Sequence, residues 1–153
     1  MKITILTLFP DMFSGFTSQS IIKRTIDKGL VSFNLVNIRD FTTDRYGRVD
    51  TPPIGGGAGL VMKAQPIVSA LKNSSSELTH KILLSPTGKP FTQADAIRLA
   101  AMNDLLFACG HYEGVDARVE SYFDEQISIG DFILTGGELG AMVISDAIIR
   151  LIP

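Results

Sequence analysis

Tryptophan is absent from the 153-residue sequence, and cysteine occurs only once, as Cys109. A single cysteine cannot form an intrachain disulfide or a cysteine-based metal cluster. No apolar run is long enough to span a membrane, so we expect no membrane partner. The N-terminal run 1–10 lacks the small-residue cleavage pattern of a signal peptide and predicts a first strand instead. Together these absences favour a cytoplasmic protein.

A large excess of charge of one sign is also lacking, since the net charge is −2. The distribution is uneven: residues 1–63 carry eight Lys or Arg against five Asp or Glu, whereas residues 64–153 carry six against eleven. A basic N-terminal part suits a polyanionic partner, although a random scatter of surface charge explains it equally well.

The length and the 45% hydrophobic content indicate one folded domain with a sizeable core. Apolar, β-branched runs alternate along the chain with segments of helical period. This alternation predicts an α/β domain with a mainly parallel sheet and flanking helices. The expected strands are 2–8, 31–38, 81–84, 104–109 and 126–130; the expected helices are a short one around 12–16, capped by Asp11, and others at 20–28, 65–72, from 91 onwards, 115–122 and 138–151.

Two segments depart from a simple alternation. Residues 39–59 have no clean period and hold two prolines and four glycines near their end. Such a segment is typical of a loop that orders on a partner, or of plain disorder. The final helix, 138–151, is apolar on nearly all sides, as in a deeply buried helix or one at an interface. We favour a dimer interface.

The stretch SIGDFILTGGELG, residues 128–140, joins an apolar strand end to the final helix. Thr135 and Glu138 have the spacing of a capping box, and the glycines between them let a ligand approach bare backbone. Two further strand ends carry glycine, at 85–90 and 110–114. Ligands bind at the carboxyl ends of parallel strands, so the three segments predict one pocket, lined mainly by backbone and suited to adenine-like edges. The alternative is an ordinary strand-to-helix turn.

Familiar phosphate-binding motifs do not fit this sequence. The segment 87–90 lacks the upstream glycine and the hydroxyl residue of a P-loop. The glycine-rich run 55–59 follows two prolines rather than a strand, which argues against a dinucleotide-binding loop.

Several side chains could contribute chemistry, although each has a structural alternative. His111 could act as a general base or could simply be solvated. Asp131 could be desolvated by its apolar neighbours. Glu113 could hydrogen-bond a base edge or lie on the surface. Arg150 could stabilise developing negative charge, but its spacing from Asp146 equally fits an ion pair within a helix.

Six segments closely resemble the bacterial tRNA (guanine-N1-)-methyltransferase family of the SPOUT superfamily. They occur in the family's order and cover most of the chain. The segments are LTLFPDMF at 6–13, RDFTTDRYGRVD at 39–50, GGGAGLVM at 55–62, LLSPTGKPFTQ at 83–93, CGHYEGVDAR at 109–118 and SIGDFILTGGELGAM at 128–142.

This resemblance implies an enzyme that transfers methyl from S-adenosylmethionine to N1 of the guanosine at tRNA position 37, just 3′ of the anticodon. It also implies a homodimer with active sites between two protomers. The fold it implies is a SPOUT-type α/β domain with a deep trefoil knot, a topology that general fold rules disfavour. Mg²⁺ is linked to the family's activity, but the resemblance assigns no metal-binding residue here.

The resemblance further implies roles for individual residues. Arg150 matches the catalytic arginine, and Glu113, Asp50 and Gly59 are expected to meet the tRNA. The residues expected at the cofactor are Leu84, Ser85, Pro86, Thr87, Gly88, Gly110, Tyr112, Glu113, Gly114, Ser128, Ile129, Gly130, Asp131, Phe132, Ile133, Leu134, Gly136, Gly137 and Gly140.

The sequence also departs from the family's pattern. Thr51, Thr87 and Gly140 stand where Asp, Gln and Pro are usual. The chain stops at Pro153, before the linker aspartate that serves as the family's general base and before its C-terminal tRNA-binding domain. We therefore expect one domain, 1–153, that binds cofactor and dimerises but methylates tRNA poorly. A ribose 2′-O-methylating relative and a non-catalytic RNA-binding module are the alternatives.

Overall fold

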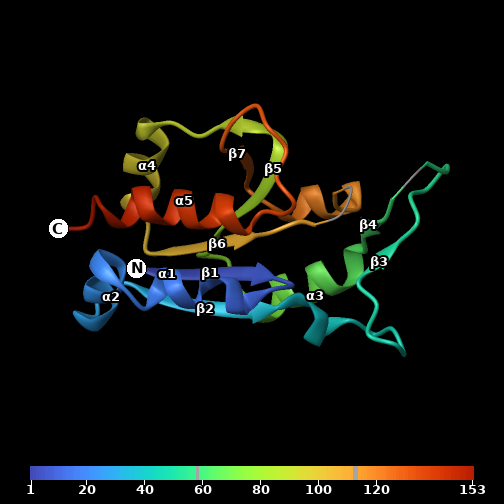
Figure 1. The fold of residues 1–153 in the computed structure, drawn as a ribbon, viewed down its shortest axis with the longest axis horizontal. Helices are drawn as coiled ribbons and strands as arrows, with labels where there is room; N and C mark the ends of the chain where they lie inside the picture. Colours follow the sequence, from blue (N-terminus) through green and yellow to red (C-terminus); the bar gives the residue numbers. More distant parts are fainter. Residues whose placement is uncertain (58, 112–113) are drawn as a thin grey trace.

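A five-stranded sheet forms the centre of the computed structural model, which describes residues 1–57, 59–111 and 114–153 (Figure 1). The strands lie in the order β2–β1–β6–β5–β7, and every neighbouring pair is parallel. The predicted α/β class and its mainly parallel sheet are confirmed; the trefoil knot stays a prediction. The strands are β1 Lys2–Thr7, β2 Ser32–Asn37, β5 His80–Pro90, β6 Asp104–Ala108 and β7 Glu125–Ser128.

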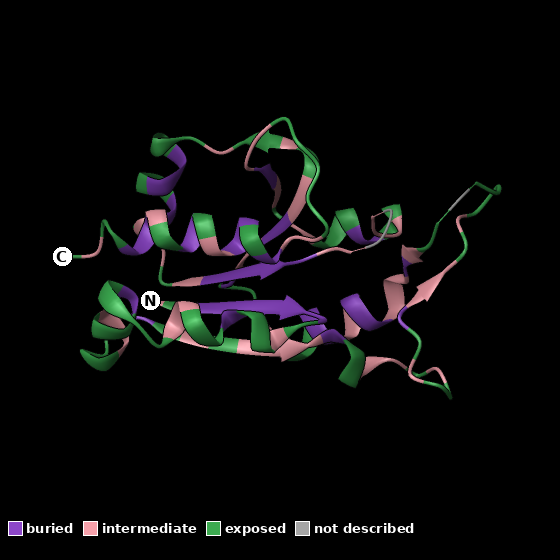
Figure 2. Cartoon of the chain, viewed as in Figure 1, coloured by how far each residue is buried: buried purple, intermediate pink, exposed green. Residues whose placement is uncertain are grey.

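Helices cover both faces of the sheet, because successive strand residues point alternately into two apolar clusters. Ile3 and Ile5 of β1 share one cluster with residues of α2, α4 and α5. Leu6 belongs to the other cluster, with α3. Figure 2 shows β1 and β6 buried between these layers. The helices are α1 Ser14–Thr17, α2 Ser20–Asp27, α3 Ala64–Ser74, α4 Gln93–Ala100 and α5 Glu138–Ile149.

A projection leaves the body of the domain between β2 and α3, at the right of Figure 1. The 3-10 turn η2 (Ile38–Phe41) packs against α3 at the base of the projection. The projection contains a short antiparallel pair, β3 (Asp50–Thr51) with β4 (Val61–Met62). The segment predicted to be irregular is therefore partly structured. The strand that leads back from the projection, β4, is hydrogen-bonded to the body of the domain, because the Met62 N–H donates to the carbonyl of Gly114 at 2.9 Å.

Two local predictions near the ends of β1 and β6 had different outcomes. The helix expected at 115–122 is present as a 3-10 helix, η3 (Ala117–Tyr122), and the Asp116 side chain accepts from the Arg118 N–H at its start. Asp11 does not cap the helix that follows β1; it lies inside the 3-10 turn η1 (Pro10–Phe13). None of the helices formed by the described residues has the length and apolar character of a transmembrane span.

The most consequential difference concerns β5, which was expected to end at Leu84. Leu84 pairs with Ile127 of β7, and so does Lys89, because the register shifts between them. Residues 85–88 therefore stand outside the ladder as a bulge, after which the strand resumes. The segment 85–90, expected to be a loop, is a bulge followed by two more ladder residues.

Charged side chains fasten α4 to the end of β5. Asp95, only 3% exposed, shares a capping box with Thr92 and accepts from Lys89 and Arg98. Burial alone would raise the pKa of this carboxyl, but the hydrogen bonds from Thr92, Lys89 and Arg98 outweigh burial and hold its pKa well below the ordinary value. The ionised form is therefore stabilised in the folded state.

We predict that Asp95→Ala lowers the free energy of unfolding by about 2–3 kcal/mol at pH 7, because charge-assisted bonds and the helix cap are both lost. A carboxyl with a depressed folded-state pKa contributes stability above its unfolded-state pKa and loses it as the pH falls. The difference from wild type should therefore shrink as the pH drops below about 3.8. Urea unfolding at pH 7 and pH 2.5 measures it.

The control is Asp27→Ala, which removes an exposed i,i+4 pair with Lys23. That change should alter the free energy by less than about 0.5 kcal/mol. An Asp95→Ala deficit of equal size at both pH values would contradict the proposed linkage.

Candidate functional site

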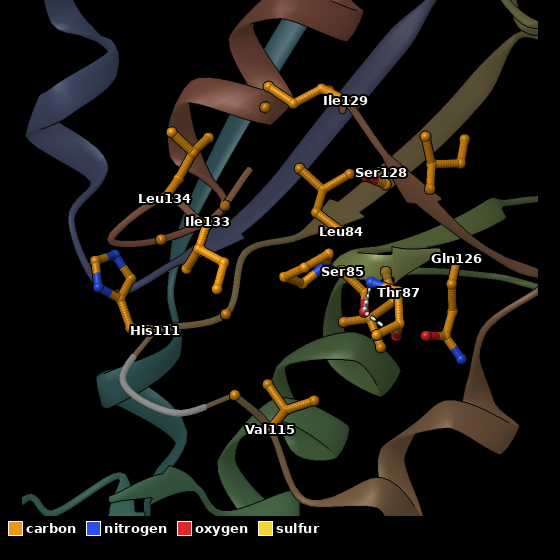
Figure 3. A pocket seen from close by; sticks show the side chains of 18 of the residues that line it. Leu84, Ser85, Thr87, His111, Val115, Gln126, Ser128, Ile129, Ile133 and Leu134 are labelled. Atoms are coloured by element: carbon orange, nitrogen blue, oxygen red, sulfur yellow. Dashed lines mark hydrogen bonds between the residues drawn. The ribbon is translucent and has the colours of Figure 1, made fainter. Parts of the chain in front are cut away.

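A cavity of about 390 Å³ lies at the edge of the sheet where β5, β6 and β7 end. Three segments form its walls: the β5 bulge, the turn after β6 and the chain between β7 and α5. Figure 3 shows Leu84, His111 and Ile133, one from each segment, around the same space. The predicted meeting of three strand ends in one pocket is therefore present.

The first wall is the bulge in β5. The Ser85 hydroxyl lies 3.0 Å from that of Thr87 and accepts the Thr87 N–H at 3.3 Å, which holds the bulge in shape (Figure 3). Gly88 lets the chain re-enter the ladder: a Cβ there would lie 2.7 Å from the backbone of Gln126 and Ile127. Close strand approach at this point therefore requires glycine.

The second and third walls are joined directly by backbone. The Gly137 N–H donates to the Gly110 carbonyl at 3.0 Å, and His111 forms an isolated antiparallel bridge with Gly136. A Cβ on Gly137 would approach Cys109 Cα to 2.9 Å. The paired glycines therefore serve close packing of two turns, as well as leaving bare backbone at the cavity.

Glu138 was expected to belong to a capping box, and this prediction was wrong. Gly137 is the N-cap of α5, and no side chain caps it. Glu138 instead turns inward, 1% exposed, where its carboxylate accepts from the Thr7 hydroxyl at 2.7 Å and lies 2.5 Å from His111 Nε2. A favourable helix N-terminus and two hydrogen-bonding partners compensate for burying this charge.

The cavity has little charge of its own. Glu120 is the only Asp, Glu, Lys or Arg among the described residues that line it, and its carboxylate forms no ion pair with another described residue. Cys109 lies just below the cavity and is 1% exposed. Burial, and then the nearby charge of Glu138, raise the pKa of its thiol well above the ordinary value. Cys109 is thus a packed, neutral thiol rather than a nucleophile.

Most of the residues expected at the cofactor line this cavity. They are Leu84, Ser85, Pro86, Thr87, Gly110, Gly114, Ser128, Ile129, Gly130, Phe132, Ile133, Leu134, Gly136, Gly137 and Gly140. Gly88 and Asp131 are not among the lining residues; Asp131 is exposed, so the expected desolvation by apolar neighbours is wrong. Tyr112 and Glu113 lie outside the described residues.

The residues expected at tRNA and at the reaction lie elsewhere. Asp50 and Gly59 belong to the projection between β2 and α3. Arg150 is exposed at the C-terminal end of α5, whereas the cavity touches that helix at its N-terminal end, through Gly137 and Gly140. Of the ion pairs among the described residues, none joins Arg150 to Asp146.

Sequence reasoning missed several lining residues. They are Leu83, Val115, Glu120, Gln126 and Ile127. His111 and Thr135 also line the cavity and lie within the segments expected to form it, although neither was assigned to the cofactor. Gln126 and Ile127 could have been found from the expected pairing of neighbouring strands, because they face the β5 bulge. Glu120 was missed because no binding role was expected of the helix at 115–122.

We predict that Gly88→Ala lowers the free energy of unfolding by about 1–3 kcal/mol, because its Cβ must push the β5 and β7 backbones apart. Gly15→Ala is the matched control, since a Cβ at that helical position meets nothing within 4 Å and should be neutral or slightly stabilising. Thermal unfolding compares the two variants. Equal midpoints would show that the close approach at Gly88 does not constrain the strands.

A parallel α/β domain with a backbone-lined pocket at the carboxyl edge of its sheet belongs to the class of domains that bind a small organic ligand there. The sequence model described as tRNA (guanine-1)-methyltransferase TrmD matches residues 1–153. The chain therefore belongs to the tRNA (guanine-1)-methyltransferase family.

Individual relatives agree with this assignment. Proteins named tRNA (guanine-N(1)-)-methyltransferase are 53% identical in Carboxydothermus hydrogenoformans, 50% in Dictyoglomus turgidum and 49% in Staphylococcus carnosus. Each similarity covers 100% of this chain but only 61%, 62% and 63% of the respective relative. The chain thus spans a little under two thirds of the length of these relatives.

Proposed function

We propose that this chain is the cofactor-binding, dimer-forming domain of an enzyme that methylates N1 of guanosine at tRNA position 37, with S-adenosylmethionine as donor. The observation that carries the proposal is the cavity itself: three of the six segments that resemble the family, 83–93, 109–118 and 128–142, converge on it at the ligand-binding edge of the sheet. The Mg²⁺ dependence implied by the resemblance belongs to the same proposal, and chelation with EDTA tests it.

The cavity fits S-adenosylmethionine in size and chemistry. Its volume of about 390 Å³ lies within the usual range for small-molecule sites. Glycine backbone at Gly110 and Gly136 lies in the same lining as the apolar side chains of Leu84 and Ile129, a combination that suits a purine ring. The unpaired carboxylate of Glu120 is the complement that a cationic ligand needs.

The reaction requires more than methyl supply. When bound, S-adenosylmethionine would provide an electrophilic methyl group. Guanine N1 carries a proton at neutral pH, so transfer also needs a base for that proton and a cation near O6. Arg150 would provide the cation, and by resemblance the base is an aspartate in the family's linker.

Arg150 is at the wrong end of α5 to act in the cavity of its own chain. The helix has 12 residues, so its ends are about 18 Å apart. We therefore propose a homodimer in which the arginine of each copy serves the pocket of the other. Leu139 and Val143, both 50% exposed on α5, supply apolar surface for that contact. The 153-residue chain alone should consequently bind cofactor and dimerise, yet methylate tRNA poorly.

We predict that isothermal titration calorimetry will detect S-adenosylmethionine binding to this chain. Glu120→Gln should weaken it about two- to fivefold, because the charge of an exposed carboxylate that lines the cavity is lost. Glu77→Gln is the control, since Glu77 is exposed like Glu120 but does not line the cavity. Absence of binding heat with sub-millimolar protein would refute the proposed cofactor.

The product is tested with an extended chain that includes the family's linker and C-terminal domain, acting on a tRNA transcript. Primer extension should stop at a guanosine in position 37 and read through when that position is adenosine, because an N1-methyl blocks base pairing. We predict that Arg150→Ala in this protein lowers kcat by at least about a hundredfold with a smaller change in KM. Read-through of a methylated product would indicate ribose methylation, and cofactor-independent RNA binding unaffected by Arg150→Ala would indicate a non-catalytic module.

A further inference from the structure

Two His–Glu pairs with the same distance between imidazole and carboxylate occur among the described residues. In each, imidazole Nε2 lies 2.5 Å from a carboxylate oxygen: His80 with Glu125, and His111 with Glu138. The first pair lies where β5 and β7 begin, away from the cavity. The second lies at the cavity, because His111 is one of its lining residues. Only the second pair can affect a ligand directly.

The His111–Glu138 pair connects three separate parts of the chain. Glu138 begins α5, His111 follows β6, and the Thr7 hydroxyl at the end of β1 donates to the second carboxylate oxygen at 2.7 Å. The Phe9 ring packs against the imidazole, with ring centroids 4.8 Å apart. The Glu138 side chain is 2% exposed and the His111 side chain 16%. The carboxylate therefore depends on protein groups rather than on solvent for its hydrogen bonds.

The pair also lies directly beneath the contact between two pocket walls. His111 bridges Gly136 through the backbone, and Gly137 donates to Gly110. All four of these residues line the cavity. Movement of either ring or carboxylate would shift the backbone amides on both sides of the pocket. Side chains that hold two backbone-lined walls in register determine the geometry those walls present to a ligand.

We propose that His111 and Glu138 are positioning residues of the pocket, which hold the turn after β6 against the entry to α5 so that their backbone groups match the bound cofactor. This inference rests on the proposed function, because the ligand is taken to be S-adenosylmethionine. It assigns neither side chain a chemical step. The role of Glu138 is then to support binding, in place of the helix capping that the sequence predicted. His111 acts as its hydrogen-bond donor.

A purely structural role makes a different prediction. Breaking either His–Glu pair removes a hydrogen bond from a carboxylate and should reduce stability. The effect should be smaller at His80, because Glu125 keeps two hydrogen bonds from Arg98, at 2.8 and 2.9 Å. Only a positioning role also reduces ligand affinity in protein that remains folded. The His80–Glu125 pair is thus an internal control of matched residue types and distance, contributed by the same chain.

The experiment compares His111→Leu and His111→Gln with His80→Leu and His80→Gln. Leucine approximates the size of histidine without a donor, whereas glutamine retains an N–H near the position of Nε2. Calorimetric titration with S-adenosylmethionine at 25 °C gives each Kd, and thermal unfolding confirms that each variant is folded at that temperature. If His111→Leu is unfolded there, Glu138→Gln replaces it, since the amide keeps the shape and removes the charge.

We expect His111→Leu to weaken binding about tenfold or more and His111→Gln to restore most of that loss. Both His80 variants should lower the unfolding midpoint yet keep Kd within about twofold of wild type. Unchanged affinity in His111→Leu, or an equal loss in His80→Leu, would overturn the positioning role. So would a loss in His111→Gln as large as that in His111→Leu. If the wild-type chain itself fails to bind, the proposed function fails first, and this inference with it.

Discussion

Parallel pairing is the constraint on which the rest of this structure depends. All five strands run in one direction, so their carboxyl ends meet at one edge of the sheet. At that edge the polypeptide leaves the ladder after each strand, and its backbone groups lose their partners in the neighbouring strands. Here β5, β6 and β7 leave through glycine-bearing segments, which lie around one cavity. The binding site is thus a consequence of strand direction combined with small residues at three exits.

The β5–β7 pair shows how this edge is shaped. Leu84 and Lys89 both pair with Ile127, and the intervening residues bulge into the cavity wall. Resumption of the ladder after the bulge fixes both of its ends, so the wall is held more firmly than a free loop. On the other side of the cavity, the buried carboxylate of Glu138 links β1, the turn after β6 and α5. Regular pairing holds one wall, and a polar contact beneath the surface holds the others.

The sequence was sufficient for the fold class and for the approximate position of the cavity. Alternating apolar runs define strands and helices, and glycine at the strand ends indicates where backbone becomes accessible. The β5 bulge was not predictable, because a register shift depends on contact with β7 rather than on local pattern. Nor did the sequence specify the type of helix at 115–122, where η3 is a 3-10 helix packed against α3. Residue periodicity does not separate these two helix types over so short a length.

Glu138 illustrates the same limit for a single residue. Thr135 and Glu138 have the spacing of a capping box, yet Glu138 finds Thr7 and His111, which are distant in sequence. Tertiary contacts override local capping because a buried carboxylate needs donors that its own turn does not supply. The role of His111 was hidden for the same reason. Arg150 was identified by resemblance, and its place at the far end of α5 is what makes a second copy of the chain necessary to the proposed site.

The central claim is that the three strand exits form the site of S-adenosylmethionine. Hydrogen–deuterium exchange of the chain, with and without S-adenosylmethionine, tests it most directly because the walls consist largely of backbone amides. The account predicts slower exchange in peptides covering 84–88, 109–111 and 128–137, with little change in the other peptides of the chain. A second, polar hollow lies beside β2 and the end of α3, lined by Asn34, Asn73 and Ser76 among others. Protection confined to that hollow, with none at the three strand exits, would contradict the account.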